Sequence, residues 1–443
     1  MYRVDFFDAK IIEGTTTSIV LDNGNIKEVS ENYTKGAGVR ALSRGSWGYT
    51  SVDGDFDLNK AIGAASELAV GMDERSPKEK VDILDISKPV ARNMPHVRID
   101  PRDISLEEKV KLLKEIGNRA KIDGISSTSA VYSESSYKVL YTDSTGIEGE
   151  YELMRTGFAI SAVASREGMY QAGRESRFGV TGYEIFEKHD AFKLAESAAR
   201  TALELLDAKP AKGGNMPVIL DPELAGVFAH EAVGHASEAD LVLEGSSILE
   251  NRIGQQIASP LINIIDDPTL HEYGFFPFDD EGTQSQKTVI IRDGVFDSYL
   301  HSRETAAKLG GQPGHCRAQG HAKPIVRMSN TYIDNGNSTL EEMLEEIRNG
   351  VYLIGSRGGQ VNTGEGVFQF NAEKGYLIEN GKLTSLIRDV SLSGKTLEIL
   401  NNVRMVGNDL TLNSGRCGKG GQLVPVTDGS PHLMVSEALV GGA

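Results

Sequence analysis

The sequence predicts an α+β fold, in which N-terminal α/β units precede a C-terminal, curved, barrel-like antiparallel β domain that carries a short histidine-containing helix. Helical and strand-like hydrophobic patterns both occur in the first half of the chain. In the second half, Asp293-Gly294 and Asn380-Gly381 each separate two strand-like runs, and such dipeptides are typical of tight antiparallel hairpins. Most of the remaining second half consists of strand-like segments and glycine-rich loops, which favours a curved sheet.

We divide the chain into a first α+β domain at residues 1–72, a connector at 73–104, a central α+β domain at 105–210 and a third domain at 213–443. The connector is charged and contains several prolines, which interrupt helices and strands. A chain of 443 residues is long enough for two or three domains with sizeable cores.

The elements of the first domain follow from a turn and a helical pattern. Asn23-Gly24 predicts a hairpin between short strands at Ser18–Leu21 and Ile26–Val29. The pattern of Leu58–Val70 predicts a helix.

The central domain is expected to combine two helices with an antiparallel meander. Ser105 and Glu108 form a capping box that begins a helix reaching about Ala120. Asp190 is the expected N-cap of a second helix that ends near Asp207. Between them, strand-like alternation occurs in four runs, at 126–132, 138–142, 149–154 and 159–164.

The third domain begins with a strand that leads into the histidine-containing helix. Met216–Leu220 predicts a short buried strand, and Asp221-Pro222 predicts the N-cap and first position of a helix. Glu231 continues the apolar stripe of this helix, so we expect it to be buried, with a pKa raised toward that of a general base. Further on, Ser338 and Glu341 predict the start of a helix that reaches about Ile347.

The segment 230–235, HEAVGH, carries the candidate chemistry. Two imidazoles and a carboxylate provide two metal ligands and a base, which is the combination that zinc hydrolases use. Residues five apart diverge by about 140° on an ideal helix, so His230 and His235 reach one ion if the helix ends or bulges between them. Gly234 is the expected place for this break. The motif alone also fits two polar residues at a helix end.

A metal site needs a third ligand, and cysteine is a candidate. The chain has two cysteines, which form no CxxC pair. Cys417 lies between glycines, and the nearby Arg416 and Lys419 favour its thiolate form. Cys316, next to His315, is a second candidate, although a buried inert thiol is the commoner role of a lone cysteine.

Three further segments are candidates for substrate binding. Asp280 and Glu281, in the run DDEGT, would bind a cation or a substrate amine, or would form a solvated turn. Gly358-Gly359-Gln360 would let a peptide backbone lie against the sheet, or would permit a bend. His321 would orient or stabilise the reacting carbonyl, or would hydrogen-bond a metal ligand.

Composition excludes several classes of protein. The formal net charge of −17 argues against nonspecific binding to nucleic acid. No apolar run approaches 18 residues, so we expect no membrane span, and the first ten residues lack the apolar core of a signal peptide. Two unpaired cysteines fit a cytoplasmic protein.

A series of motifs runs along nearly the whole chain and is densest from about residue 213 onward. These motifs are GAGVRALS at 36–43, HEAVGH at 230–235, DDEGT at 279–283, SNTYI at 329–333, GGQV at 358–361, YLIENGK at 376–382, VGNDL at 406–410 and CGKGGQ at 417–422. Through them the chain resembles the TldD/PmbA family of modulator-of-gyrase proteases, on the TldD side.

The resemblance implies a role for each residue of the candidate site. His230, His235 and Cys417 stand where the family has its zinc ligands, and Glu231 stands at its catalytic glutamate. Cys316 matches no family motif. The resemblance further implies dimers, either with a second copy or with a TldE/PmbA-type subunit that lacks the zinc motif, and substrates that are short or unfolded peptides.

We therefore expect a Zn²⁺-dependent peptidase in which water occupies the fourth metal position and Glu231 acts as general base. Two alternatives remain open. The chain would act on non-peptide amides as a zinc amidohydrolase, or it would be a non-catalytic binding or regulatory subunit whose zinc is structural, with four protein ligands.

Overall fold

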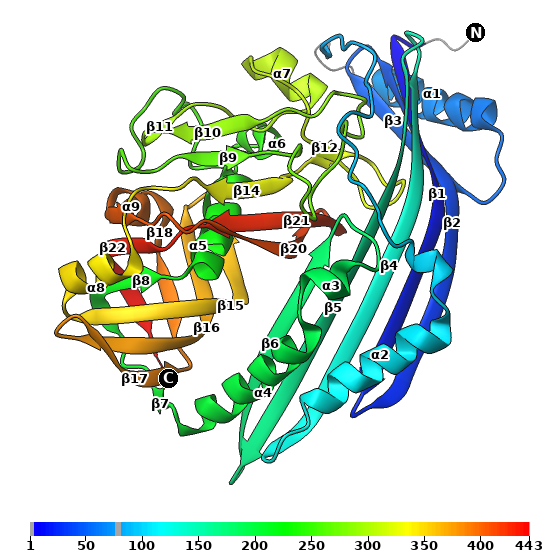
Figure 1. The fold of residues 1–443 in the computed structure, drawn as a ribbon. Helices are drawn as coiled ribbons and strands as arrows, with labels where there is room; N and C mark the ends of the chain where they lie inside the picture. The colour runs from blue at the N-terminus through cyan, green and yellow to red at the C-terminus, as the bar shows by residue number, and fades with distance from the viewer. Residues whose placement is uncertain (1–3, 76–80, 443) are drawn as a thin grey trace.

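The computed structural model describes residues 4–75 and 81–442, and its longest strands form a strongly twisted six-stranded sheet (Figure 1). All neighbouring strands of this sheet are antiparallel, in the order β3-β2-β1-β4-β5-β6. The strands are β1 (Phe6–Asp22), β2 (Asn25–Ser43), β3 (Ser46–Asp53), β4 (Ile125–Asp143), β5 (Glu148–Arg166) and β6 (Met169–Gly179).

This one sheet contains strands from both the first and the central domain, because β1 pairs with β4 along most of its length. The sequence pattern predicted separate units with short strands. Instead, the runs 126–132 and 138–142 are both parts of β4, and the runs 149–154 and 159–164 are both parts of β5. Polar residues in the middle of these strands obscured their continuity. One of them is Glu134, which is buried in β4 and accepts a hydrogen bond from Lys109 Nζ at 2.8 Å.

Helices cover one face of the N-terminal sheet. Ala9 packs against α1 (Leu58–Arg75), and Ile19, ten residues further along β1, packs with Leu113 of α2 (Leu106–Arg119). Side chains an even number of residues apart share a strand face, so both helices lie on the same side. The predicted capping box of Ser105 and Glu108 and the Asp190 cap of α4 (Ala191–Asp207) are confirmed. Two short helical turns are η1 (Pro101–Asp103) and α3 (Ile185–Lys188).

The third domain contains a closed five-stranded barrel. Its strands follow the order β15-β8-β22-β18-β16, and β16 pairs again with β15 to close the ring. The predicted α+β fold with a barrel-like C-terminal domain is confirmed, except that the pair β8 and β15 is parallel. The strands are β8 (Gly214–Leu220), β15 (Gly350–Asn362), β16 (Val367–Glu379), β18 (Ser391–Lys395) and β22 (Leu433–Gly441), with β7 (Lys209–Pro210), β17 (Lys382–Arg388) and β19 (Val403–Val406) attached.

A second six-stranded sheet lies beside the barrel, in the order β11-β10-β9-β14-β21-β20 (Figure 1). Its strands are β9 (Ile264–Asp266), β10 (Thr288–Arg292), β11 (Val295–Phe296), β14 (Asn330–Ile333), β20 (Thr411–Lys419) and β21 (Gln422–Ser430); β12 (Cys316–Arg317) and β13 (Ile325–Val326) form a small separate pair. Both predicted hairpins, at Asp293-Gly294 and Asn380-Gly381, are confirmed. The third-domain helices outside the candidate site are α7 (Arg303–Leu309), α8 (Leu340–Ile347) and α9 (Thr396–Asn401). The start of α8 is one residue later than predicted, because Thr339 and Glu342 form the capping box.

Buried ion pairs join the third domain to the other face of the N-terminal sheet. Arg40 donates through Nε to Asp8 Oδ1 at 2.9 Å and through Nη1 to Glu281 Oε1 at 2.8 Å. Lys10 Nζ donates to Asp280 Oδ2 at 2.7 Å, and these five side chains are all buried. A charge that is buried without its counter-ion is strongly destabilising, so this network fixes the position of the third domain relative to the N-terminal sheet.

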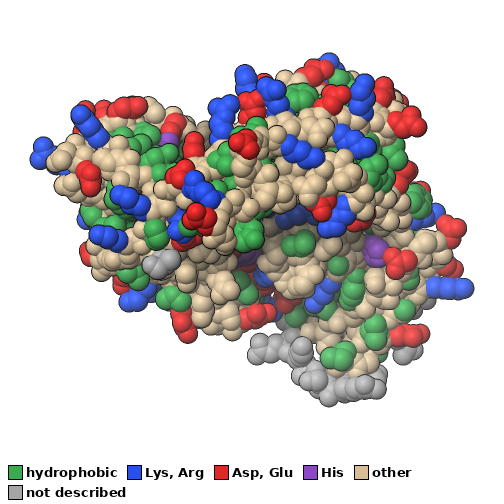
Figure 2. Space-filling model, turned by 90° about the horizontal axis from the view of Figure 1, so that it is seen from below, with side chains coloured by type: hydrophobic (Ala, Val, Ile, Leu, Met, Phe, Trp, Pro, Cys, Tyr) green, Lys and Arg blue, Asp and Glu red, His purple; other side chains and the backbone are tan. Residues whose placement is uncertain are grey.

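The surface carries charges of both signs. On the face in Figure 2, Lys and Arg side chains are interspersed with Asp and Glu, and the surface is hollowed between the side of the barrel and the side of the N-terminal sheet. Within residues 4–75 and 81–442, no helix has both the length and the apolar character needed to cross a lipid bilayer.

The buried network gives a first prediction. Arg40→Met leaves Asp8 and Glu281 as buried carboxylates without their cation, which should lower the free energy of unfolding by about 3–5 kcal/mol. Urea denaturation measures this change. The matched control is Lys35→Met, because Lys35 pairs with Asp55, whose side chain is 94% exposed; its urea midpoint should stay close to that of the wild type. Equal midpoints for Arg40→Met and the wild type would contradict the interpretation.

A buried histidine gives a second prediction. Burial and the neighbouring His315 lower the pKa of His301 to about 4, whereas the unfolded chain titrates near 6.5. Between these values only the unfolded state takes up the proton, so stability is lost as the pH falls from 6.5 toward 4. When the pH falls from 7.5 to 4.5, the free energy of unfolding of His301→Gln should therefore decrease by about 2–3 kcal/mol less than that of the wild type. Urea unfolding at both pH values measures the two decreases. Parallel losses in the two proteins would refute this.

Candidate metal centre

The histidine-containing helix begins as the sequence predicts. Asp221 is the N-cap of α5 (Pro222–Phe228), its carboxylate accepts a hydrogen bond from Leu224 N at 2.9 Å, and Pro222 occupies the first helical position. The helix follows β8 directly and contacts β15 of the barrel and both β20 and β21 of the second sheet. It therefore extends from the barrel into the contact with the second sheet.

The helix changes geometry within the motif. Ala229–Gly234 form a π-helix, whose last hydrogen bond runs from His235 N to His230 O, and a 3-10 turn follows at His235–Ser237. The predicted bulge between the histidines is therefore present. A Cβ on Gly234 would lie 1.9 Å from Met328 Sδ, so glycine is required there by close packing. The chain then continues into α6 (Ala239–Leu243).

Cys417 comes to the histidines on β20 of the second sheet. β20 belongs to the sheet beside the barrel and not to the barrel itself. Cys417 Sγ lies 3.3 Å from His235 Nε2, across 182 residues of sequence. One ligand atom each from His230, His235 and Cys417 lies within 4.8 Å of the others. All three residues are buried, with exposures of 3%, 8% and 1%.

The three side chains favour a thiolate beside imidazoles. Burial opposes ionisation of Cys417, but the charges of His230 and His235 and the hydrogen bond between His235 and the sulfur lower its pKa to about 5. Burial likewise lowers the pKa of each histidine, and the thiolate beside His230 and the carboxylate of Glu238 beside His235 more than reverse this effect. A thiolate is the form of cysteine that binds metal.

This donor set fits a zinc ion. Two imidazoles and one thiolate are ligands that zinc commonly takes in proteins. Both ring nitrogens of His230 are buried and have no hydrogen-bond partner. A buried imidazole without hydrogen-bond partners destabilises the folded protein, and a metal ion would supply the missing interaction. Among the described residues, this is the one group of three or more His, Cys, Asp and Glu side chains close enough to share an ion.

Glu231 lies at the solvent side of this group. Its side chain is 37% exposed, and its Oε2 lies 3.7 Å from His235 Nε2. Glu231 is thus less buried than its place on the apolar stripe predicted, because the π-helix turns it away from the core formed by Leu224 and Phe228. A partly exposed carboxylate beside the ligands is accessible to water.

The other candidates predicted from sequence lie in different surroundings. Asp280 and Glu281 are held in the buried ion pairs with Lys10 and Arg40, which leaves them no free charge for a substrate. His321 lies against the N-terminal strands: its Nε2 is 3.1 Å from Asp53 Oδ1, and its carbonyl accepts a hydrogen bond from the Tyr49 hydroxyl at 2.6 Å. None of the three contacts a metal ligand through a hydrogen bond or ion pair in the described structure.

The glycine segment and the second cysteine are also accounted for. Gly358-Gly359-Gln360 is exposed on β15, where the strand register shifts between Ser356 and Gly359. A Cβ on Gly359 would lie 2.2 Å from the backbone oxygen of Gln369, so glycine is needed for this close approach of strands. Cys316 is buried, and burial raises its pKa well above the usual value, which fits an inert thiol.

Two polar residues near the centre, Glu238 and Asp428, escaped the sequence interpretation. Glu238 contacts His235, and Lys419, which the sequence placed near the thiol, forms ion pairs with Glu238 and Asp240. Asp428 lies over α5, where its Oδ1 would be 3.0 Å from a Cβ on Gly226. Burial, together with Glu231, raises the pKa of Asp428 to about 7. Glu238 stands three residues after His235, and that spacing was the available signal.

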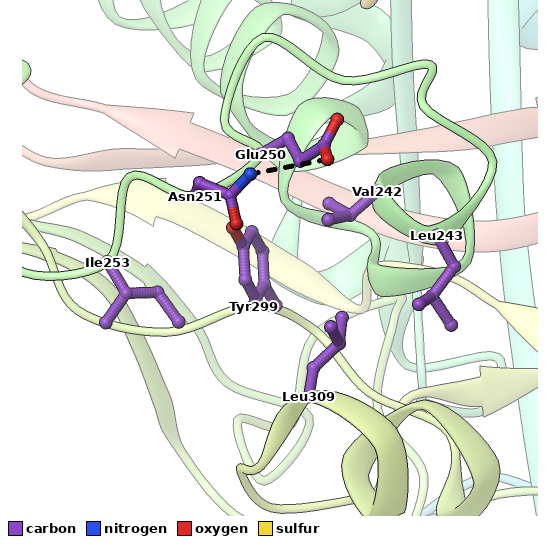
Figure 3. Close-up of a pocket in the computed structure, with 7 residues that line it drawn as sticks. All are labelled: Val242, Leu243, Glu250, Asn251, Ile253, Tyr299 and Leu309. Atoms are coloured by element: carbon purple, nitrogen blue, oxygen red, sulfur yellow. Dashed lines mark hydrogen bonds between the residues drawn. The ribbon is translucent and has the colours of Figure 1, made fainter.

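A separate pocket lies on the far end of α6 from the ligands (Figure 3). It has a volume of about 390 Å³ and is lined by Val242, Leu243, Glu250, Asn251, Ile253, Tyr299 and Leu309. None of the three candidate ligands lines it, so we treat it as distinct from the metal centre.

Comparison with known protein families gives a match along the whole chain. Residues 213–442 match the PmbA/TldA metallopeptidase C-terminal domain, residues 99–206 match its central domain, and residues 7–69 match its domain 1. A metalloprotease of Archaeoglobus fulgidus is 45% identical, over 99% of this chain and 100% of that protein. A zinc metalloprotease TldD homolog of Saccharolobus solfataricus is 30% identical, over 94% of this chain and 92% of that protein.

Solved structures share the fold. A putative modulator of a DNA gyrase from Thermotoga maritima superposes with a TM-score of 0.82 at 22% identity, covering 98% of this chain and 96% of that one. TldE from Thermococcus kodakarensis superposes with a TM-score of 0.78 at 21% identity, covering 99% and 97%. At these identities the structural likeness establishes the fold alone.

The packing at the π-helix predicts the effect of a single methyl group. Gly234→Ala forces Met328 and the backbone before His235 apart, which should cost about 1–3 kcal/mol and weaken zinc binding. Gly234→Ala combined with Met328→Ala should restore much of the binding, because it vacates the space. Competition with a chromophoric chelator measures affinity. Gly71→Ala, in open surroundings, is the control. If Gly234→Ala binds zinc as the wild type does, the packing argument fails.

Proposed function

Because the chain belongs to the PmbA/TldA metallopeptidase family, also named TldD/PmbA, we propose that it is a zinc-dependent peptidase of the TldD type. In this proposal His230, His235 and Cys417 hold the zinc ion, and Glu231 is the general base. The observation that carries the proposal is the convergence of one thiol and two imidazoles within 4.8 Å, beside a partly exposed glutamate.

The chemistry divides between the ion and the chain. When bound, zinc supplies a Lewis acid that polarises a carbonyl and lowers the pKa of water. Glu231 takes a proton from the attacking water and passes a proton to the leaving amine. A thiolate ligand places more negative charge on zinc than a third imidazole would, so positioning of the substrate must contribute more of the rate.

The proposed substrates are short or unfolded peptides. The three ligand residues are at most 8% exposed, and Glu231 is the member of the motif that water reaches. A folded protein cannot bring its backbone to a recessed site of this kind, whereas an extended segment can. At the exposed stretch Gly358-Gly359-Gln360, such an extended segment would lie against the sheet.

We further propose that the chain works as a dimer in the cytoplasm. Membership of the PmbA/TldA family, with the zinc motif retained, supports an assembly with a TldE/PmbA-type subunit, and a pair of identical chains is the second arrangement. Mixing the purified chain with such a subunit and measuring mass by light scattering distinguishes the two. Both cysteines are free, which fits a reducing compartment.

Substitution of the base tests the proposed function. Glu231→Gln keeps the ligands but removes the proton acceptor, so it should keep about one zinc per chain and lose about 10²–10⁴-fold in activity. Metal analysis and cleavage of an unstructured peptide library, alone and with a TldE-type subunit, measure both properties.

Four other outcomes would be informative. Undiminished cleavage by Glu231→Gln would remove this residue from the mechanism. Zinc without cleavage in the wild type under every condition would favour the non-catalytic subunit, and cleavage of small acylated amides in place of peptides would favour the amidohydrolase. Wild-type protein without metal would refute the metal centre.

A further inference from the structure

A second pair of side chains connects the two chain segments that carry the proposed ligands. Glu238 lies three residues after His235, and Lys419 lies two residues after Cys417. Lys419 Nζ is 3.1 Å from Glu238 Oε2, while His235 Nε2 is 3.3 Å from Cys417 Sγ. The helix end and β20 are therefore joined at two neighbouring points, one of them at the ligands and one beside them.

Glu238 acts directly on His235. Its Oε2 lies 2.9 Å from His235 Nδ1, and its side chain is completely buried. A buried carboxylate accepts hydrogen bonds, so Nδ1 of His235 donates its hydrogen to Glu238, and Nε2 is the nitrogen that a metal ion would bind in place of a proton. Since Nε2 is the atom that faces Cys417, the nitrogen left free by Glu238 is the one needed by a metal ion.

Lys419 supplies the charge that lets Glu238 stay ionised inside the protein. Besides Glu238, Lys419 Nζ donates to Asp240 Oδ1 at 2.7 Å and to the carbonyl of Val326 at 3.0 Å. An isolated buried carboxylate would neutralise and lose its hold on the imidazole.

We propose that Glu238 and Lys419 are positioning residues that hold the His235 ring with Nδ1 against Glu238 and Nε2 toward Cys417 and keep β20 against the end of the helix, so that the ligands are arranged before metal binds. This inference rests on the metal centre proposed above. The two histidines then differ, because His230 has no partner on either nitrogen and is fixed by the metal alone.

Zinc affinity tests this arrangement without any assay of catalysis. Metal-free protein is titrated with Zn²⁺ against a chromophoric chelator, for the wild type, Glu238→Gln, Lys419→Met, His235→Ala and the double variant of His235→Ala with Glu238→Gln. Glu238→Gln should weaken binding by about 10–100-fold, the range found when a carboxylate behind a ligating histidine is removed. Lys419→Met should weaken binding in the same direction, and circular dichroism verifies the fold of each variant.

The double variant separates positioning from a general loss of structure. If Glu238 acts through His235, adding Glu238→Gln to His235→Ala should cause no further loss of affinity, because the side chain it positions is gone. Asp240→Asn is the matched control, since Asp240 contacts Lys419 but not His235, and it should change affinity by less than about threefold.

Two results would overturn the proposal. The first is a zinc affinity of Glu238→Gln within about twofold of the wild type, where a 10–100-fold loss is expected. The second is a double variant whose zinc affinity falls below that of His235→Ala by the full effect of Glu238→Gln. If Glu238→Gln does not fold, Glu238→Asp replaces it in the experiment. This variant keeps the carboxylate but shortens the side chain by one methylene, and its zinc affinity is compared with that of the wild type. A wild type that binds no zinc would refute the metal centre itself, which is a different result from an unaltered Glu238→Gln.

Discussion

The candidate centre depends on one irregular turn of helix. His230 and His235 are five residues apart, and on a regular α-helix they would point in widely different directions. The hydrogen bond from His235 N to His230 O closes a π turn, in which residue i and residue i+5 return to the same side. Gly234 lets Met328 pack directly against this turn, because a Cβ at this position would lie 1.9 Å from Met328 Sδ. A local departure from α-helical geometry thus converts a sequence spacing into a metal-binding spacing.

The third proposed ligand comes from a part of the chain whose position is set by long-range packing. Cys417 is placed by β20, which is held to β21 along its whole length and, through β21, to β14. The same sheet carries Lys419 to Glu238, so one strand provides both a proposed ligand and an ion pair beside another proposed ligand. Placing the thiol on a sheet of the core, with the histidines on a helix that packs against that sheet, gives the site a rigid support.

Short-range patterns predicted the local elements of this site, whereas the approach of Cys417 to the histidines was expected only from the family resemblance, and the contact of Glu238 with Lys419 was missed. The Asp221 cap, the break at Gly234 and the two hairpin turns each depend on a few adjacent residues, and all are present. The merging of the first two units into one sheet depends on pairing of β1 with β4, more than 100 residues apart, and short-range patterns do not contain it. The strand lengths were missed for a related reason, since Glu134 interrupts the apolar alternation and its partner Lys109 lies on another element.

The charged motif DDEGT shows most clearly why a sequence does not reveal the use of a charge. Asp280 and Glu281 have the residue types expected of a substrate-binding pair, and their partners Lys10 and Arg40 lie 270 and 241 residues away. Asp280 and Glu281 form ion pairs with these cations, and the pairs connect the N-terminal sheet to the third domain. Glu238 is the opposite case. The sequence does not mark it as a site residue, but its buried carboxylate contacts His235 in the candidate centre. The role of a carboxylate here follows from the cation it meets and from its exclusion from water.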